Sequence, residues 1–197
     1  MTEVKKIMDT KLFHTDDNEI AEAGEILRNG GLVAFPTETV YGLGASAFDS
    51  DAAKKIYAAK GRPSDNPLIV HICDKGQIKD IAEEIPESAK KIIDNFMPGP
   101  VTIILKKKSV VPDDVTAGLN TVAIRFPLHE TAQKLIKAAG VPIAAPSANL
   151  SGKPSPTKAK HVVKDMTGRI DAIINSGECN VGVESTIVDF TGEKPVI

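Results

Sequence analysis

Aromatic residues are scarce in this 197-residue chain, which has no tryptophan, two tyrosines and six phenylalanines. This scarcity argues against a protein that stacks nucleic-acid bases on aromatic side chains. The formal net charge of -2 argues against coating nucleic acid through bulk positive charge, although it leaves local basic patches open. Apolar residues make up 42% of the sequence and charged residues 25%, which is typical of a globular protein with a substantial core.

Cysteine and long apolar runs are also lacking. Cys73 and Cys179 are the two cysteines, too few for a disulfide framework, so a reducing compartment is expected. No apolar run approaches the ~20 residues of a membrane-spanning helix, and residues 1–6 contain no signal-peptide core. These absences predict a cytoplasmic protein that does not associate with membranes.

Several catalytic motifs are missing. The chain has no Gly-x4-Gly-Lys-Ser/Thr phosphate loop and no Gly-x-Ser-x-Gly nucleophile elbow. The run 42–47 (GLGASA) follows a predicted strand, but no helix opens directly from it, which argues against dinucleotide binding. His71 and Cys73 share a strand face, yet the histidines show no ligand spacing, so no metal site is expected. Both cysteines are interpreted as packing residues.

Helical periodicity and strand-like apolar runs alternate along the whole chain. Helices are predicted at 16–29, 51–60, 75–84, 87–96, 129–139 and 157–166, and strands at 32–35, 68–72, 101–105, 121–126, 141–145, 172–174 and 186–190. The alternation predicts one α/β domain over residues 1–197 with a mixed sheet. Ser50 is expected to cap the second helix. Residues 36–45 are expected not to be buried throughout. Residues 106–109 are expected to lie at a solvated sheet edge.

The run from Lys60 to Asn66 combines cations, glycine and proline. Pro63 favours an extended backbone at Arg62, and in an extended chain Lys60 and Arg62 point to the same side, which suits a polyanion such as a triphosphate. The alternative is a solvated turn. His71 ends the strand that follows, where sheets of this kind carry ligands, or else it is a core histidine.

Polar residues also interrupt or border other predicted strands. Arg125 lies in an otherwise apolar strand, so it must reach a cleft or form a buried ion pair. Residues 147–152 follow a strand and either offer donors and backbone N–H groups to an anion or cap their own turn. Ser185 opens the last strand. Thr37 and Thr39 are two residues apart, so their hydroxyls share one side of an extended chain.

Short polar donors and cations therefore recur at strand ends in five segments, 37–39, 60–71, 121–125, 147–155 and 184–186. An α/β enzyme builds its site by bringing such groups together at one end of the sheet. The residues alone predict a site for a phosphorylated or carboxylated small molecule and specify nothing further.

Seven motifs, in order along nearly the whole chain, resemble the YrdC family. They are residues 36–44 (PTETVYGLG), 60–63 (KGRP), 66–71 (NPLIVH), 98–102 (PGPVT), 122–127 (VAIRFP), 146–152 (PSANLSG) and 184–189 (ESTIVD). The resemblance implies an open α/β fold in which one twisted mixed sheet is flanked by helices and carries a concave basic groove. It also implies an enzyme that condenses L-threonine, bicarbonate or CO2, and ATP to threonylcarbamoyl-AMP. This nucleotidyltransferase would release pyrophosphate and serve N6-threonylcarbamoyladenosine modification of tRNA.

The resemblance assigns site residues by position. Threonine would be held by Thr39, His71, Arg125, Ser185 and the backbone of Ala145. ATP would be held by Lys60, Arg62, Asn66, Thr121, Ser147 and Ser155, with Mg2+ on its phosphates. Lys60, Arg62 and His71 would be catalytic: the two cations would offset charge as pyrophosphate leaves, and His71 is the nearest candidate for a general base. No tightly bound organic cofactor is implied. The partners would be the small substrates and, downstream, a tRNA-modifying transferase and tRNA.

Family members usually continue past the position of Ile197 into a Leu-Arg-x-Gly segment whose arginine contacts the nucleotide, and some carry a linker and a second domain. The resemblance therefore implies that the catalytic domain is cut short at Ile197. The alternative function is an RNA-binding module that uses the basic groove. Lys153, Lys158, Lys160, Lys164 and Arg169 add local positive charge, which either attracts phosphate or RNA or forms a solvated helix face. A third alternative, the related domain of hydrogenase-maturation carbamoyltransferases, carries cysteine pairs that are absent here.

Overall fold

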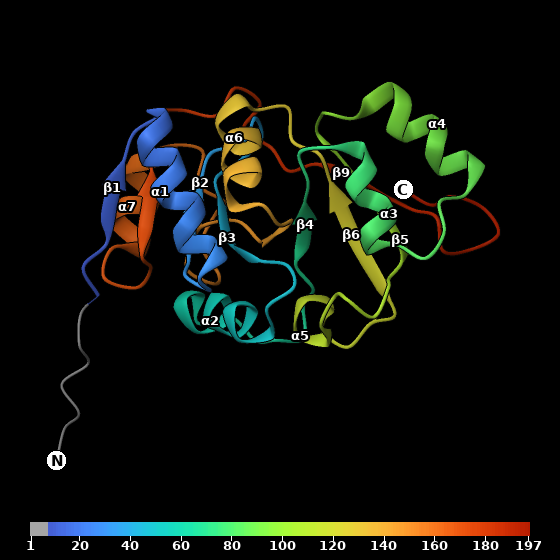
Figure 1. The fold of residues 1–197 in the computed structure, drawn as a ribbon, viewed down its shortest axis with the longest axis horizontal. Helices are drawn as coiled ribbons and strands as arrows, with labels where there is room; N and C mark the ends of the chain where they lie inside the picture. Colours follow the sequence, from blue (N-terminus) through green and yellow to red (C-terminus); the bar gives the residue numbers. More distant parts are fainter. Residues whose placement is uncertain (1–7) are drawn as a thin grey trace, which may run out of the picture.

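A computed structural model describes residues 8–197 of the protein (Figure 1). The expectation about a signal-peptide core concerns residues 1–6, which lie outside the described residues. The elements are β1 (Lys11–Phe13), α1 (Asp17–Arg28), β2 (Val33–Phe35), β3 (Gly42–Ser46), α2 (Ser50–Lys60), β4 (Ile69–His71), the 3-10 turn η1 (Lys75–Gln77), α3 (Ile78–Ile81), α4 (Glu87–Phe96), β5 (Val101–Lys106), α5 (Asp113–Thr116), β6 (Thr121–Arg125), α6 (Glu130–Ala139), β7 (Ile143–Ala145), α7 (Ala159–Met166), β8 (Ala172–Ile174) and β9 (Thr186–Asp189).

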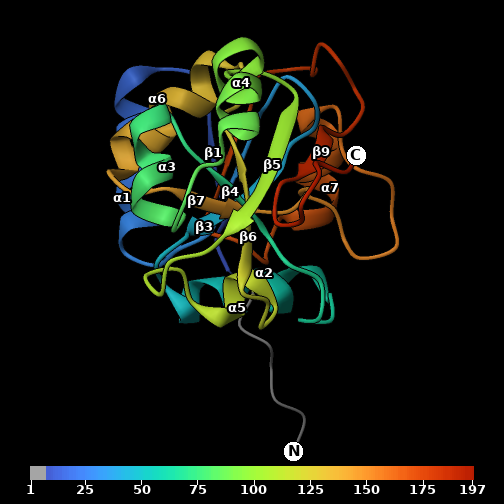
Figure 2. The same cartoon turned by 90° about the vertical axis from the view of Figure 1, so that its right-hand side faces the viewer.

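The nine strands of the described residues form one open sheet in the order β1-β8-β2-β3-β7-β4-β6-β5-β9. Neighbours such as β4 and β6 are parallel, whereas β7 pairs antiparallel with both β3 and β4. The prediction of one mixed sheet is therefore confirmed. In Figure 2, α1, α3 and α6 lie to the left of the strands, α7 lies to the right, and α2 and α5 lie at the lower end.

Helix α1 shows how the sequence sets an element and its packing. Asp16 caps it by accepting hydrogen bonds from the N–H groups of Asn18 (2.9 Å) and Glu19 (3.4 Å). Its buried face then packs against α6 with Gly24 at the contact, where an added Cβ would lie 2.7 Å from the carbonyl carbon of Ala138. Glycine is therefore required for the two helices to approach this closely.

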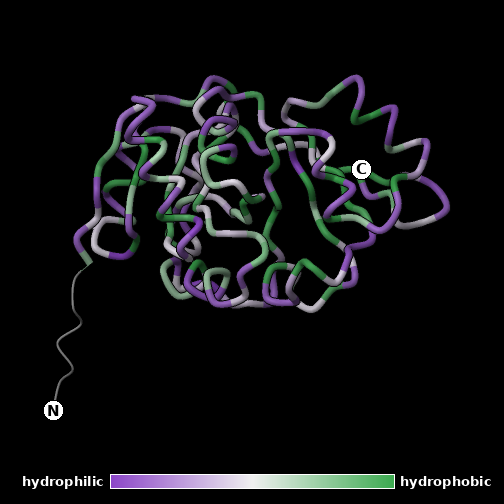
Figure 3. Tube along the Cα trace, in the orientation of Figure 1, coloured by the Kyte–Doolittle hydropathy of each residue, from purple (hydrophilic) through white to green (hydrophobic). Residues whose placement is uncertain are grey.

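The core lies on both faces of the sheet. One cluster fills the space between α1, α6 and the β1-β8-β2 end, while a larger one spans the central strands, α2, α4 and α7. In Figure 3 the central strands run mainly in green and white, and purple gathers on the outward turns of the helices. Both cysteines are free and contribute to this packing, as expected, and burial raises the pKa of the Cys179 thiol to about 11.

Several local expectations are wrong. The cap of α2 is Asp49, whose side chain accepts from the N–H groups of Asp51 (2.9 Å) and Ala52 (3.0 Å), while Ser50 is the first helical residue. Residues 36–45 are buried throughout, because glycines let β3 lie flat against its neighbours: a Cβ at Gly44 would lie 2.7 Å from the side chain of Ile143. Residues 106–109 are solvated as expected, with only Lys107 half-buried. The strand that they end or follow, β5, is however not an edge strand, since β9 pairs with its outer side.

Strands β1 and β3 and helix α5 were not predicted. Strand β1 and helix α5 have only three and four residues, which carry too little periodicity to detect, and β3 contains two glycines, which are uncommon in strands. The helix expected at 75–84 is a 3-10 turn followed by one turn of α-helix, α3. The run 42–47 belongs to β3, so no helix follows β2 directly and the argument against a dinucleotide-binding turn is confirmed.

Candidate active site

The register of the sheet places the predicted polar residues side by side. Arg125 of β6 lies opposite His71 of β4 on one side and opposite Thr102 of β5 on the other. Residues directly opposite one another in neighbouring strands point to the same face. The hydroxyl of Thr102 lies 2.7 Å from that of Ser185, at the start of β9. A polar row therefore crosses four strands.

This row borders a cavity of about 310 Å3. Nine of the eleven predicted site residues line it, namely Thr39, Arg62, Asn66, His71, Arg125, Ala145, Ser147, Ser155 and Ser185. All five segments singled out by the sequence contribute to the lining, so their predicted convergence is confirmed. Thr121 and Lys60 are outside it. Thr121 begins β6 on the same face as Ala123, which lines the cavity.

Arg125 combines both of its predicted alternatives, because it forms a buried ion pair and also lines the cavity. Its side chain is 4% exposed, and its Nη2 lies 2.8 Å from Oε1 of Glu38, which is 7% exposed. The contact lacks hydrogen-bond alignment, so Nε and Nη2 of Arg125 and both carboxylate oxygens of Glu38 have no hydrogen-bond partner. Glu38 was not predicted. A buried guanidinium that lines a cavity suits a carboxylate ligand.

His71 is neutral in this environment. Its ring is buried edge-to-face against Phe35, with the ring centroids 5.8 Å apart, and its Nδ1 lies 3.0 Å from the carbonyl oxygen of Ile69. Burial first, and then the charge of Arg125, lower the pKa of His71 to about 3. Because a carbonyl only accepts, Nδ1 carries the proton, and the other ring nitrogen is left as an acceptor. Such a histidine accepts a hydrogen bond but is a weak base.

Lys60 departs from the expected extended arrangement. It is the last residue of α2, followed by Gly61 in the left-handed conformation (φ 60°), so helix geometry directs its side chain. The ammonium is buried and donates to the carbonyl oxygens of Ser147 and Asn149, the latter at 2.7 Å. Burial, and then the charge of Arg62, lower the pKa of Lys60 to about 8. Lys60 therefore anchors the loop that begins with Ser147.

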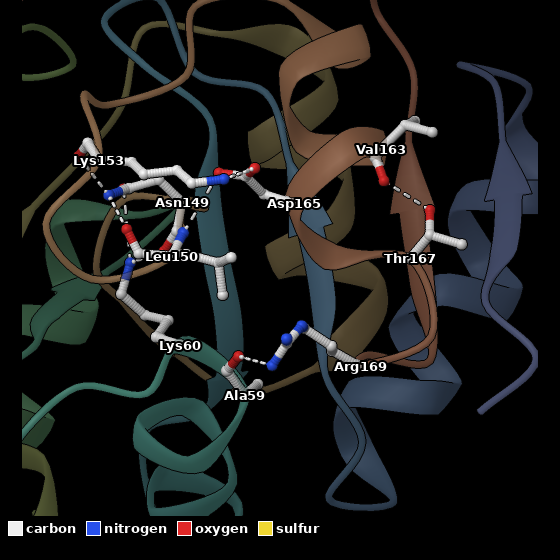
Figure 4. A network of polar contacts seen from close by, with 9 residues as sticks. All are labelled: Ala59, Lys60, Asn149, Leu150, Lys153, Val163, Asp165, Thr167 and Arg169. Carbon is white, nitrogen blue, oxygen red and sulfur yellow. Dashed lines mark hydrogen bonds and ion pairs between the residues drawn. The ribbon is translucent and has the colours of Figure 1, made fainter. Parts of the chain in front are cut away.

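Figure 4 shows that this anchor belongs to a larger polar network. The side-chain amide of Asn149 donates to the carbonyl oxygens of Leu150 (2.9 Å) and Lys153 (2.7 Å). Lys153 in turn pairs with Asp165 of α7 at 2.6 Å. The loop after β7 is thus fixed at both ends. Both alternatives predicted for residues 147–152 apply, because the turn caps itself through Asn149 and also contributes Ser147 to the cavity wall.

Polar groups at the mouth of the cavity are more exposed than those inside. Arg62 is half-buried and its Nη2 donates to the carbonyl oxygen of Asn66 at 3.3 Å. Glu184 also lines the cavity and is exposed, and a hydrogen bond from Ser155 lowers its pKa. No cluster of three or more metal-ligating side chains occurs within residues 8–197. None of the helices in that range has the length and apolar character needed to cross a bilayer.

Comparison with known proteins identifies the family. A family model for the Sua5/YciO/YrdC domain, described as "Telomere recombination", matches residues 25–197. The chain belongs to this family. It is 56% identical over 179 residues to the threonylcarbamoyl-AMP synthase of Pyrococcus abyssi, which covers 91% of this chain and 53% of that protein. It is also 56% identical over 189 residues to the Bacillus subtilis enzyme of the same name, covering 95% of this chain and 55% of that protein.

The fold is shared with a solved member. The crystal structure of P. abyssi Sua5 complexed with L-threonine superposes with a TM-score of 0.93 at 53% identity, covering 94% of this chain and 56% of that one. The predicted family and open mixed α/β fold are therefore confirmed. The chain spans about half the length of the curated relatives it matches.

Proposed function

We propose that this member of the Sua5/YciO/YrdC family is a threonylcarbamoyl-AMP synthase whose cavity binds L-threonine, with ATP at the mouth. The observation that carries the proposal is Arg125, a nine-tenths buried guanidinium that lines the cavity. A carboxylate is the group that such a guanidinium binds best. The names of relatives 45–56% identical to this chain support the same activity.

The inner cavity offers groups for the rest of an amino acid. We assign the carboxylate of threonine to Arg125, and its other polar groups to Thr39, Ser185, His71 and the backbone of Ala145. With a pKa of about 3, His71 accepts a hydrogen bond from the substrate and is poorly suited to remove its proton. A volume of about 310 Å3 is at the lower end of the ~300–1,000 Å3 of ligand pockets, so the nucleotide must extend beyond it.

The mouth offers groups for ATP. We assign the phosphates to Arg62 and the adjoining polar contacts to Asn66, Thr121, Ser147 and Ser155. Lys60 acts mainly by holding the loop that presents Ser147, because its ammonium is already bonded to that loop. Mg2+ would arrive on the phosphates and screen their charge, since Mg2+ commonly uses substrate phosphates as ligands. Among the described lining residues, Glu184 is the one carboxylate that could also contact the ion.

The proposed reaction needs no protein nucleophile. The amine of threonine adds to CO2, derived from bicarbonate, to give a carbamate and a proton. A carbamate oxygen then forms a bond to the α-phosphorus of ATP while the bond to the β-phosphate oxygen breaks, which releases pyrophosphate. The chain supplies positioning, charge stabilisation and exclusion of water from the unstable carbamate. A tRNA-modifying transferase and tRNA would act on the product.

The test is pyrophosphate release with ATP, Mg2+ and bicarbonate, in the presence and absence of L-threonine. We expect release that depends on threonine, and loss of this dependence in Arg125→Gln. Arg169→Gln is the matched control, because Arg169 is exposed and lies outside the cavity. Absence of both threonine-dependent release and calorimetric threonine binding would overturn the proposal. Salt-dependent tRNA binding without either signal would instead favour the RNA-binding alternative, which the relatives' names do not support.

A further inference from the structure

Thr37 is in contact with Thr39, and the single hydrogen of its hydroxyl is already used elsewhere. Its hydroxyl donates to the carbonyl oxygen of Val40 at 2.6 Å. The same oxygen accepts from the backbone N–H groups of Thr39 and Val40, each at 3.2 Å. Thr37 is 2% exposed and Thr39 is fully buried from bulk solvent, although both line the cavity.

The position of one hydrogen follows from these contacts. The hydroxyl oxygens of Thr37 and Thr39 are 3.0 Å apart and form a hydrogen bond in which either oxygen could donate; this contact is closer than the two N–H contacts at 3.2 Å. A hydroxyl has a single hydrogen, and a carbonyl oxygen has none to give. Since Thr37 has placed its hydrogen on the carbonyl of Val40, Thr39 must donate to Thr37. The Thr39 hydroxyl is therefore left with only lone pairs to offer the cavity.

The loop that carries both threonines is held in place from outside the cavity. The backbone N–H of Val181 donates to the carbonyl oxygen of Glu38 at 2.8 Å, and that of Gly182 donates to the carbonyl oxygen of Thr39 at 3.1 Å. The Thr39 hydroxyl is thus fixed in position as well as in polarity. For a ligand, such a group is a preorganised acceptor.

We infer that Thr37 is a specificity-determining residue, which acts through Thr39 by fixing the Thr39 hydroxyl as an acceptor for the side-chain hydroxyl of the bound amino acid. The inference rests on the proposed function, because it concerns selection among amino acids at that site. A ligand without the hydroxyl leaves the lone pairs of Thr39 buried and unpaired. A site built around a substrate hydroxyl discriminates strongly against such a ligand.

The test compares L-threonine with L-2-aminobutyrate, which differs from it by the hydroxyl alone. Dissociation constants for both are measured by calorimetry on wild type and on Thr37→Val, which keeps the side-chain shape and removes the hydroxyl. We expect the preference for L-threonine to fall about tenfold in Thr37→Val, which corresponds to about 1.4 kcal/mol. Thr37→Ser, which retains the hydroxyl, should keep the wild-type preference. Thr37→Ala replaces Thr37→Val if the latter does not fold.

The ratio of the two constants separates specificity from a structural role. If the variant loses affinity for both amino acids equally, or keeps the wild-type ratio, Thr37 merely shapes the loop and the inference is wrong. Thr39→Val should lose the preference as well, and retention of the preference there would also contradict the inference. Wild-type protein that binds neither amino acid and shows no threonine-dependent pyrophosphate release would overturn the proposed function itself, which distinguishes the two failures.

Discussion

The buried ion pair between Glu38 and Arg125 provides the sharpest test of how the site is held. Glu38→Gln keeps the size of the side chain and removes its charge, so Arg125 stays buried with no counter-ion. Exposed fractions of 7% and 4% place both side chains out of reach of bulk water. Solvent screening therefore does little to offset the loss.

The expected magnitude follows from the burial. Removing one partner of a buried pair costs about 3–5 kcal/mol of the free energy of unfolding. For a chain of 197 residues, each kcal/mol lowers Tm by about 2–4 °C, so Glu38→Gln should lower Tm by about 6–20 °C. The double variant Glu38→Gln/Arg125→Met should recover part of this loss, because no unpaired charge is then buried.

The assay is thermal unfolding by calorimetry, with and without L-threonine. If Arg125 binds the carboxylate of threonine, the ligand supplies the missing negative charge, so L-threonine should raise the Tm of Glu38→Gln by more than it raises that of wild type. Glu22→Gln is the matched control, because it neutralises the carboxylate of an exposed pair with Lys11 and should shift Tm far less. A Glu38→Gln protein that melts within about 2 °C of wild type would refute the reasoning.

Three further changes test other parts of the structure. Arg62→Ala and Lys60→Ala should each lower threonine-dependent pyrophosphate release at least about tenfold, and Lys60→Ala should also lower Tm because two carbonyls lose their donor; near-normal rates in folded variants would contradict this. The pKa of His71 in the folded protein, about 3, is below the ordinary histidine value of 6.5, so the unfolded chain binds more protons between these values and stability falls as pH drops through that window. At pH 5 the free energy of unfolding should be about 2 kcal/mol lower than at neutral pH because of His71. Denaturant unfolding should show this loss for wild type and not for His71→Asn. Gly24→Ala should destabilise by about 1–3 kcal/mol despite its better helix propensity, because the new methyl group meets Ala138; an unchanged denaturation midpoint would show that the helices can separate without cost.

The sequence predicted the elements of the site well and their contacts poorly. The strands that end at His71 and Arg125 are detectable because both are short apolar runs, and each has a polar residue at its end. Their direct opposition depends on β4 and β6 being neighbours, which no local pattern reveals. The contact between Glu38 and Arg125 likewise joins residues far apart in the chain. Glu38 stands between two threonines in the sequence, but neither its burial nor its partner was predicted.

Lys60 shows where a local rule failed. Pro63 favours an extended backbone only at Arg62, but Lys60 was predicted to be extended as well. Gly61, which follows a predicted helix, is the more direct signal, because it marks Lys60 as the end of that helix. The outcome matters for function, because a lysine at the end of α2 reaches the loop of Ser147 and Asn149 and leaves Arg62 as the cation of the cavity mouth. The two cations of one short motif are therefore expected to have different roles.

The charges of the site are divided by depth. Inside, Arg125 is balanced by Glu38 and His71 is neutral, so the inner wall carries no net charge. At the mouth, Arg62 is half-buried and forms no ion pair within residues 8–197, and the carboxylate of Glu184 lines the same cavity without pairing with it. A neutral inner wall with directed donors and acceptors suits an amino acid, which carries both charges and none overall, whereas the cation at the mouth suits a polyphosphate. This division gives a physical reason why two substrates of different charge would each occupy one part of the same site.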